Sequence, residues 1–353
     1  MDTFTHALSG ALLGRAAGHR QPRPGEPPAS VRGWVGFGAA TFPDVDGLLR
    51  LVDELLYLEY HRGATHSLVL LPLWALLVGG GFHLIYRRRY RPAWMFGIAA
   101  LGLAVHIAGD LITAYGTRLL TPLADVASSL GWVLVIDPWL TLLLVLALLA
   151  SRRRPQPGVA AAGLALVCAF VLFQGALNRH AAGYGQARAA ELGWDDPRVR
   201  ALAAPFSPFN RMLIVERDGV YQRARVNLLR REVPRIDPDR WRLWQLYRSY
   251  RPVDDPGWQR FGLLPESPDQ RPLARAAWAS PALAPYRAFA HHPVFYRLDR
   301  DGETTCAWFT DLRYWYDPLP PPFRFGGCRA TATGRWRLHE LRLDGARAPV
   351  LGH

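Results

Sequence analysis

The chain has 353 residues, of which half are hydrophobic and one fifth are charged, and its formal net charge is +13. All 42 basic residues are arginines, because the sequence contains no lysine. Mechanisms that need a lysine amine, such as Schiff-base or P-loop chemistry, are therefore excluded. A chain of this length is typical of two domains or of one large one.

Charge divides the chain into two unlike halves. Residues 1–177 contain 14 Arg and 10 Asp or Glu, whereas residues 178–353 contain 28 Arg and 19 Asp or Glu. We therefore predict a membrane-embedded domain over residues 1–177 and an extramembrane domain over residues 178–353.

Four long apolar stretches occupy the first half, at residues 67–85, 93–112, 130–150 and 158–177. Each is long enough to cross a hydrocarbon core of about 30 Å at about 1.5 Å per residue. Two weaker segments, 4–18 and 34–52, are interrupted by charges and read as a membrane hairpin or as re-entrant helices. The prediction is an all-α polytopic membrane domain with four to six membrane helices. The alternative, buried helices of a large soluble core, would not need four such stretches.

Arginine clusters predict the orientation of these helices. Arg87, Arg88, Arg89 and Arg91 separate the first two long stretches, and residues 152–154 separate the last two. Short Arg-rich loops remain cytoplasmic. In a bacterial inner membrane, this rule places residues 178–353 on the outer, periplasmic side.

A few ionisable residues interrupt the apolar half, and this orientation places all of them near the outer membrane face. They are His6, Asp44, Asp46, His61, His66, His106, Asp110 and Asp137. Ionisable residues inside a membrane are costly and indicate function by default. The spans hold no Arg to neutralise them, which favours bound cations; a proton relay is the competing explanation.

The spacing of these residues suits metal binding. His106 and Asp110 are four residues apart and share one helix face, so both can reach one ion. Histidine and aspartate together favour Zn²⁺ or Mn²⁺, and carboxylates can bridge two ions. Alternatives remain open: Asp44 and Asp46 could cap a helix, and Asp137, before Pro138, could start one. His83 is expected to be a packing residue.

Several motifs resemble one known family. The segments MDTFTHALSGALLG, FPDVD, HRGATHSL, HIAGDLITAYGTRLLTP and IDPW occur in this order over roughly residues 1–150. Together they resemble the YdjM/YfhP (DUF457) family of predicted membrane-bound metal-dependent hydrolases. Some members have a histidine where this chain has Gly47, a ligand that Asp137 could replace. The resemblance implies a site made of His6, Asp44, Asp46, His61, His66, His106 and Asp110.

A more distant similarity is to zinc-dependent phospholipase C and P1 nuclease. The further ligands of those enzymes have no clear match here, so one or two ions are expected. The resulting prediction is a hydrolase in which a metal-activated water attacks a phosphoester or lipid-like substrate. Asp46, His66 and Arg62 are the predicted catalytic residues. Arg62 would neutralise a substrate phosphate or, alternatively, snorkel to the membrane interface.

Two non-enzymatic functions use the same residues. A proton- or ion-coupled transporter would employ them as a relay, although no internal repeat typical of transporters is visible. A metal-binding regulator without activity is the other alternative.

The second half carries strand and turn signals. Residues 211–229 predict a hairpin that turns at Asp218–Gly219, residues 295–316 predict another near Asp301–Gly302, and residues 335–345 add a strand. A helix is expected over 239–250. These elements predict a small α+β domain on an antiparallel sheet.

Three further features of the second half bear on its location and chemistry. Interleaved Trp and Arg resemble a nucleic-acid surface, but an external location argues against that partner and favours packing on the membrane or over the site. His291 and His292 are expected in a loop. Cys306 and Cys328 form either a disulfide, which an oxidising compartment permits, or two buried thiols.

Overall fold

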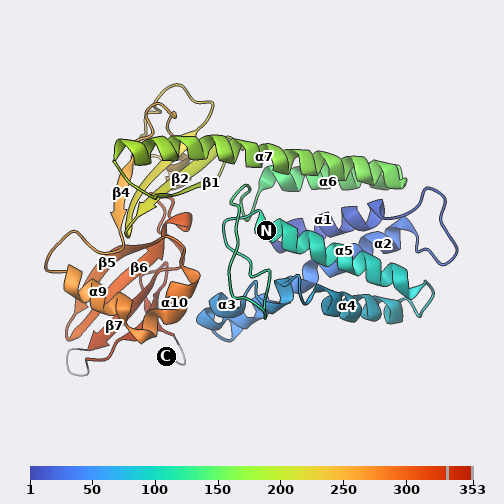
Figure 1. Cartoon of the computed structure of the whole chain (residues 1–353), viewed down its shortest axis with the longest axis horizontal. Coiled ribbons are helices and arrows are strands. Elements are labelled where there is room, and N and C mark those ends of the chain that lie inside the picture. Colours follow the sequence, from blue (N-terminus) through green and yellow to red (C-terminus); the bar gives the residue numbers. More distant parts are fainter. Residues whose placement is uncertain (331–333, 351–353) are drawn as a thin grey trace. The chain divides into compact units, whose positions relative to one another are not determined.

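The computed structural model describes residues 1–330 and 334–350 (Figure 1). The chain forms two compact units. The first comprises Met1–Leu48 and Tyr60–Leu177, and the second comprises Leu49–Glu59 and Asn178–His353.

The first unit is a helical bundle. Its α-helices are α1 (Thr3–Ala16), α2 (Ala29–Thr41), α4 (Leu71–Ile85), α5 (Pro92–Leu111), α6 (Pro138–Arg153) and the first part of α7 (Pro157–Glu191). Between α2 and α4 the chain forms the 3₁₀ segment η1 (Phe42–Leu51), α3 (Glu54–Tyr60) and the short 3₁₀ turn η2 (Ala64–His66). Figure 1 shows α1, α2, α4, α5 and α6 side by side.

The helical unit contains candidate membrane spans, but fewer than predicted. Two of them, α5 and α7, are long and apolar enough to cross a membrane. A third span results if Leu56–His66 and Leu71–Ile85, which meet at 81°, are one broken span. The prediction of four to six spans is thus not confirmed.

Residues 130–137, predicted as part of a span, form a loop instead. The backbone N–H of Leu130 donates to the carbonyl of Leu111 at 2.8 Å, and that of Trp132 donates to Ile112 at 2.8 Å. The loop thereby satisfies carbonyls at the end of α5 that have no partner within the helix. Helix α6 begins only at Pro138, because proline is favoured in the first helical turn and Asp137 caps it.

Helices α1 and α2 approach each other through glycines. A Cβ on Gly10 would lie 2.2 Å from the carbonyl oxygen of Gly36, and one on Gly36 would lie 2.1 Å from that of Gly10. Backbones can pack this closely only where side chains are missing, as at small-residue interfaces of membrane helices. The pair then packs on α5, which carries two of the predicted metal ligands.

Helix α1 runs opposite to α2 and α5, and the ionisable residues separate into two groups at opposite ends of the bundle. His6 lies near the start of α1, Asp44 follows the end of α2, and His106 and Asp110 lie near the end of α5. The end of α1, the start of α2 and the end of α6 carry arginines. Arg15 donates to Ser151 of α6 at that end, and Arg32 pairs with Glu26 at 2.8 Å.

The second unit contains two antiparallel sheets, whereas a single sheet was expected. The first sheet comprises β1 (Arg198–Ala203), β2 (Asn210–Arg217), β3 (Val220–Asn227) and β4 (Gln259–Gly262). The second comprises β5 (Pro293–Asp301), β6 (Thr304–Asp311), β7 (Phe325–Ala330), β8 (Arg337–Leu341) and β9 (Arg347–Pro349). In both sheets the strands follow chain order.

Both predicted hairpins and the predicted strand β8 are confirmed. Strands β2 and β3 are joined by Asp218 and Gly219, which have φ values of 51° and 73°. Two successive positive φ values are typical of the type I′ turn that matches the twist of a hairpin. Strands β5 and β6 pair up to Asp301 and Thr304.

Besides most of α3 and the last part of α7, the second unit contains three short α-helices among its described residues: α8 (Arg242–Arg248), α9 (Arg271–Ala279) and α10 (Ala284–Phe289). Helix α8 covers only the middle of the predicted 239–250 helix. His291 and His292 lie in a bend before β5, as expected. Cys306 and Cys328 are opposite each other on β6 and β7 and form a disulfide, so the first of the two alternatives holds.

Candidate metal centre

Five of the predicted site residues meet at one end of the bundle. They come from four elements: His6 from the first turns of α1, Asp44 from η1, His66 from η2, and His106 and Asp110 from the last turns of α5. The side chains of His6, His66, His106 and Asp110 are 0% exposed, and that of Asp44 is 15% exposed. The cluster is therefore buried except where Asp44 reaches its edge.

The tightest group is formed by His66, His106 and Asp110. Nε2 of His66 lies 2.9 Å from Nε2 of His106 and 3.1 Å from Oδ2 of Asp110. Nε2 of His106 lies 3.5 Å from the same oxygen. Atoms bound at 2.0–2.1 Å to a tetrahedral zinc lie roughly 3.3 Å from one another. The three atoms thus fit one divalent ion.

The hydrogen bonds made by the Nδ1 atoms of His66 and His106 also favour metal binding. Nδ1 of His106 lies 2.6 Å from the carbonyl oxygen of Ala40, which can only accept, so Nδ1 donates and Nε2 holds a lone pair. Nδ1 of His66 lies 2.9 Å from the Thr65 hydroxyl and 3.3 Å from Oδ2 of Asp46. Partners of this kind orient metal-binding imidazoles. If His66 is protonated at Nδ1, two lone pairs face each other, and only a cation relieves their repulsion.

The two oxygens of Asp110 have different surroundings. Oδ1 is 3.0 Å from Nε2 of His6 and 2.9 Å from the guanidinium of Arg62, and it also contacts the amino group of Met1. Oδ2 is buried without a hydrogen bond of acceptable geometry and faces His66 and His106. One oxygen is therefore held by donors, and the other remains available to a ligand.

Asp44 and His6 form a second possible group with His106. Oδ1 of Asp44 lies 3.7 Å from Nε2 of His106, and the ring of His6 stacks on that of His106 with centroids 3.7 Å apart. Because Nδ1 of His106 is engaged by Ala40, its Nε2 can serve only one ion at a time. The two groups consequently describe alternatives around one position rather than two independent sites.

Asp46 and His61 lie outside both groups, in a layer behind His66. Asp46 accepts hydrogen bonds from the Thr65 hydroxyl at 2.8 Å and the backbone N–H of Arg62 at 3.1 Å, and it lies 2.7 Å from Nδ1 of His61. Its carboxylate is thus occupied by the HRGATHS turn that carries His66. Asp46 therefore holds the turn that carries His66, and it belongs to neither of the two groups.

Arg62 is not placed to meet a substrate. Its side chain is 4% exposed, donates to the Thr113 hydroxyl at 3.0 Å, and lies over the ring of Tyr115 at 4.6 Å. Its backbone has a φ of 60°, which is a costly conformation for a residue other than glycine. The guanidinium is buried against Asp110, whereas phosphate binding or snorkelling would need it at the surface.

Asp137 is a helix cap. Its Oδ1 accepts from the backbone N–H groups of Trp139 and Leu140 at the start of α6. It stands outside both groups, so the suggestion that it replaces the ligand missing at Gly47 finds no place in the structure. Sequence reasoning overlooked Thr3, whose hydroxyl donates to Asp44 at 2.6 Å. Thr113, by contrast, is part of the HIAGDLITAYGTRLLTP segment that carries the family resemblance.

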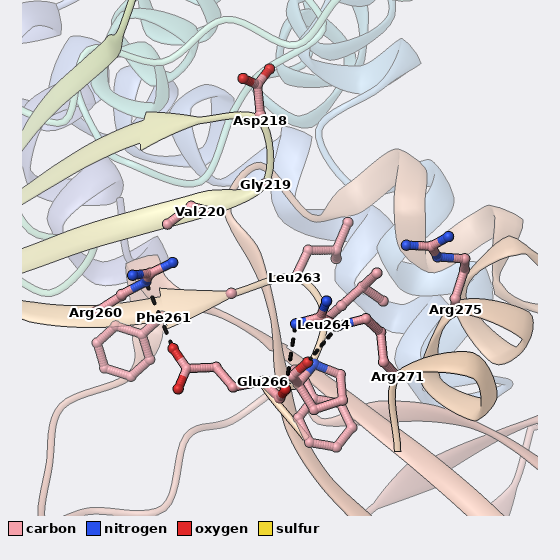
Figure 2. Close-up of a pocket in the computed structure, with 13 residues that line it drawn as sticks. Asp218, Gly219, Val220, Arg260, Phe261, Leu263, Leu264, Glu266, Arg271 and Arg275 are labelled. Atoms are coloured by element: carbon pink, nitrogen blue, oxygen red, sulfur yellow. Dashed lines mark hydrogen bonds and ion pairs between the residues drawn. The ribbon is translucent and has the colours of Figure 1, made fainter. Parts of the chain in front are cut away.

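A pocket lies elsewhere, in the second unit. Figure 2 shows this pocket of about 440 Å³, which is lined by Phe261, Leu264, Arg271 and Arg275 among others. Arg271 donates to the carbonyl of Pro265, and Arg260 lies 3.7 Å from Glu266. None of the predicted site residues lines it.

Comparisons with known proteins agree with the first half of the chain. A family model described as "YdjM inner membrane protein" matches residues 1–181. A protein of Bacillus subtilis (strain 168), described as "Uncharacterized protein YfhP", is 27% identical over 162 residues, which are 45% of this chain and 49% of that protein. The match therefore spans about half the length of that relative. No solved structure matches.

Proposed function

The chain belongs to the YdjM inner membrane protein family, and from that premise we propose that it is a membrane-bound metal-dependent hydrolase. The single observation that carries the proposal is the convergence of Nε2 of His66, Nε2 of His106 and Oδ2 of Asp110 within 3.5 Å of one another. Three protein ligands leave a coordination position open, as in catalytic zinc sites.

His66, His106 and Asp110 would hold one divalent ion, with Zn²⁺ as the best match to two imidazoles and a carboxylate. When bound, such an ion activates a water molecule near neutral pH and polarises a substrate oxygen. The other residues keep the ligands in place. His6 and Arg62 hold Oδ1 of Asp110, so that its other oxygen points at the two imidazoles.

Asp44 is the residue of this chain that we propose to move a proton. It is the most exposed carboxylate of the cluster, and its Oδ1 lies 3.9 and 3.7 Å from Nε2 of His66 and His106. Thr3 donates to its other oxygen and fixes its orientation. A carboxylate held at the edge of a buried cluster can accept a proton from an attacking water.

The substrate class follows from where the cluster lies. It lies at one end of a bundle that contains two candidate spans. If these helices cross the bilayer, that end would lie near the lipid headgroups. A phosphoester with an apolar part, such as a phospholipid, would reach it from the bilayer. The second candidate function is a proton-coupled transporter, because 2.9 Å between the two imidazole nitrogens is also a hydrogen-bonding distance.

The test uses the detergent-purified full chain. We expect one zinc per chain and hydrolysis of lipid phosphodiesters, and both should be lost in His106→Ala and in Asp110→Asn. His83→Ala is the matched control, because His83 lies on α4 outside both groups. A metal-free wild-type protein, or activity that both site variants retain, would rule out the proposed hydrolase function. Metal-free protein that acidifies vesicles in a His66-dependent manner would favour the transporter.

We further propose that the second unit lies on the periplasmic side of the inner membrane. Two observations support this: Arg15, Arg32 and Arg152 lie at the end of the bundle opposite the metal centre, and Cys306 and Cys328 form a disulfide. Alkaline phosphatase fused to the C-terminus should be active in cells. An inactive phosphatase together with a fluorescent cytoplasmic reporter at the same position would reverse the orientation.

A further inference from the structure

A groove runs along the outside of the bundle, between α1, α2 and α6. Its volume is about 160 Å³, and its walls include Leu8, Trp34, Phe37 and Leu148, with Arg15 and Arg152 among its polar residues. All of these residues belong to the first unit. The groove is therefore amphipathic, with apolar walls and two cations at its Arg-rich end.

The helical period separates this groove from the metal centre. On α1, Leu8, Ala11 and Arg15 recur at intervals of three and four residues and share one face. His6 precedes Leu8 by two residues, which is about 200° around the helix. Arg15 lies nine residues beyond His6, or about 14 Å along the axis. The groove thus faces away from the cluster, and its cationic end is remote from it.

The charges at this end are not balanced by the protein. Arg15 donates to the hydroxyl of Ser151 at 2.7 Å and to its carbonyl at 2.5 Å, both neutral groups, and it is close enough to Arg152 and Arg32 to be repelled by them. Arg32 is neutralised by Glu26. Among the described residues, Arg15 and Arg152 have no acidic partner. Two unpaired cations beside an apolar wall favour binding of an anion.

We propose that this groove binds an anionic phospholipid. Its phosphate contacts Arg15 and Arg152, and one acyl chain lies against Leu8, Phe37 and Leu148. Basic pockets between membrane helices on the cytoplasmic side bind such headgroups. Trp34, which is 57% exposed at the groove, provides an aromatic side chain of the kind that favours the membrane interface. The proposal rests on the membrane family and does not depend on the hydrolase activity.

The experiment measures lipid retained by the full chain. Protein in detergent is mixed with phosphatidylglycerol or phosphatidylcholine, and bound lipid is counted by native mass spectrometry. We expect retention of phosphatidylglycerol to be at least tenfold stronger than that of phosphatidylcholine. Arg15→Gln with Arg152→Gln should abolish this preference. Ala11→Phe, which fills the groove without changing charge, should weaken retention of both lipids.

The matched control is Arg153→Gln. Arg153 is exposed and adjacent to Arg152, but it does not line the groove, so this variant removes one charge from the same cluster. It should retain phosphatidylglycerol as the wild type does. Arg152→Gln alone serves as the test if the Arg15 variant does not fold, because Arg152 is exposed. Equal retention of the two lipids by the wild type, or equal loss in Arg153→Gln, would overturn the proposal.

Discussion

Nε2 of His66 lies 2.9 Å from Nε2 of His106, with Oδ2 of Asp110 within 3.5 Å of both atoms. The carbonyl of Ala40 keeps the proton of His106 on its other nitrogen. Two buried imidazoles in this arrangement are stable only with a proton or a metal ion between them. The stability of the first unit should therefore depend on whether a proton or a metal ion lies between His66 and His106.

Removal of metal should therefore destabilise the protein. A ligand that binds only the folded state at 100 times its dissociation constant adds about 2.7 kcal/mol. We expect the melting temperature to fall on chelation and to recover with added Zn²⁺, as followed by thermal unfolding in detergent. His106→Ala should melt at one temperature under both conditions. A wild-type melting temperature that changes with neither chelator nor zinc would contradict the metal centre.

Arg62 should act by holding Asp110. Arg62→Gln removes one of two cationic partners of this buried carboxylate, the other being the amino group of Met1. Breaking a buried pair that has no other partner costs about 3–5 kcal/mol, so the loss here should lie below that range. A bound ion would compensate part of the lost charge, so the variant should be destabilised more without zinc than with it. Arg118→Gln is the control, because Arg118 pairs with Asp125, which is 79% exposed, and such pairs contribute at most about 1 kcal/mol. Equal destabilisation with and without zinc would refute this role.

The contact between α1 and α2 should not tolerate a side chain. Gly36→Ala places a Cβ 2.1 Å from the backbone oxygen of Gly10, and overpacking of this kind typically costs about 1–3 kcal/mol. Gly97→Ala on α5 meets nothing within 4 Å and should be neutral or slightly stabilising. Thermal unfolding of the two variants measures the difference. Similar melting temperatures would show that the helices can separate freely.

His291 should make the second unit sensitive to acid. Its burial, together with the positive charge of Arg313, lowers the pKa of His291 to about 3. Between pH 3 and about 6.5 the unfolded chain binds a proton that the folded state does not, so stability falls as pH falls through this window. Partial exposure reduces the effect to about 1–2 kcal/mol between pH 7 and pH 5.

Hydrogen exchange of the β5 and β6 amides, corrected for intrinsic rates, measures this loss. His291→Asn should flatten the pH dependence, whereas His180→Asn, at an exposed position on α7, should leave it unchanged. Identical pH profiles for wild type and His291→Asn would contradict the assignment.

The sequence alone was sufficient where local patterns are strong. The Asp218–Gly219 pair lies between two runs of alternating apolar and polar residues and predicted the β2–β3 hairpin. Both turn positions need a positive φ, which few residue types adopt. His106 and Asp110 share a helix face by spacing alone. Apolar length was less reliable: residues 130–137 are as apolar as a span, yet their N–H groups bind the end of α5.

The roles within the cluster depended on tertiary contacts. The sequence predicted a ligand or catalytic role for each of His6, Asp46, Arg62 and Asp137. Spacing along the chain does not show which side-chain atoms face one another. The structure separates them, because Arg62 and His6 bind one oxygen of Asp110, Asp46 binds the turn behind His66, and Asp137 caps α6.

Residue types and their order thus determined that this chain is a membrane protein of the YdjM family with a histidine- and aspartate-rich cluster. Only the tertiary structure decided which three atoms converge. Ala40 and Thr113 complete the arrangement by hydrogen bonds to His106 and Arg62, and hydrogen bonds between distant segments leave no periodic trace in a sequence.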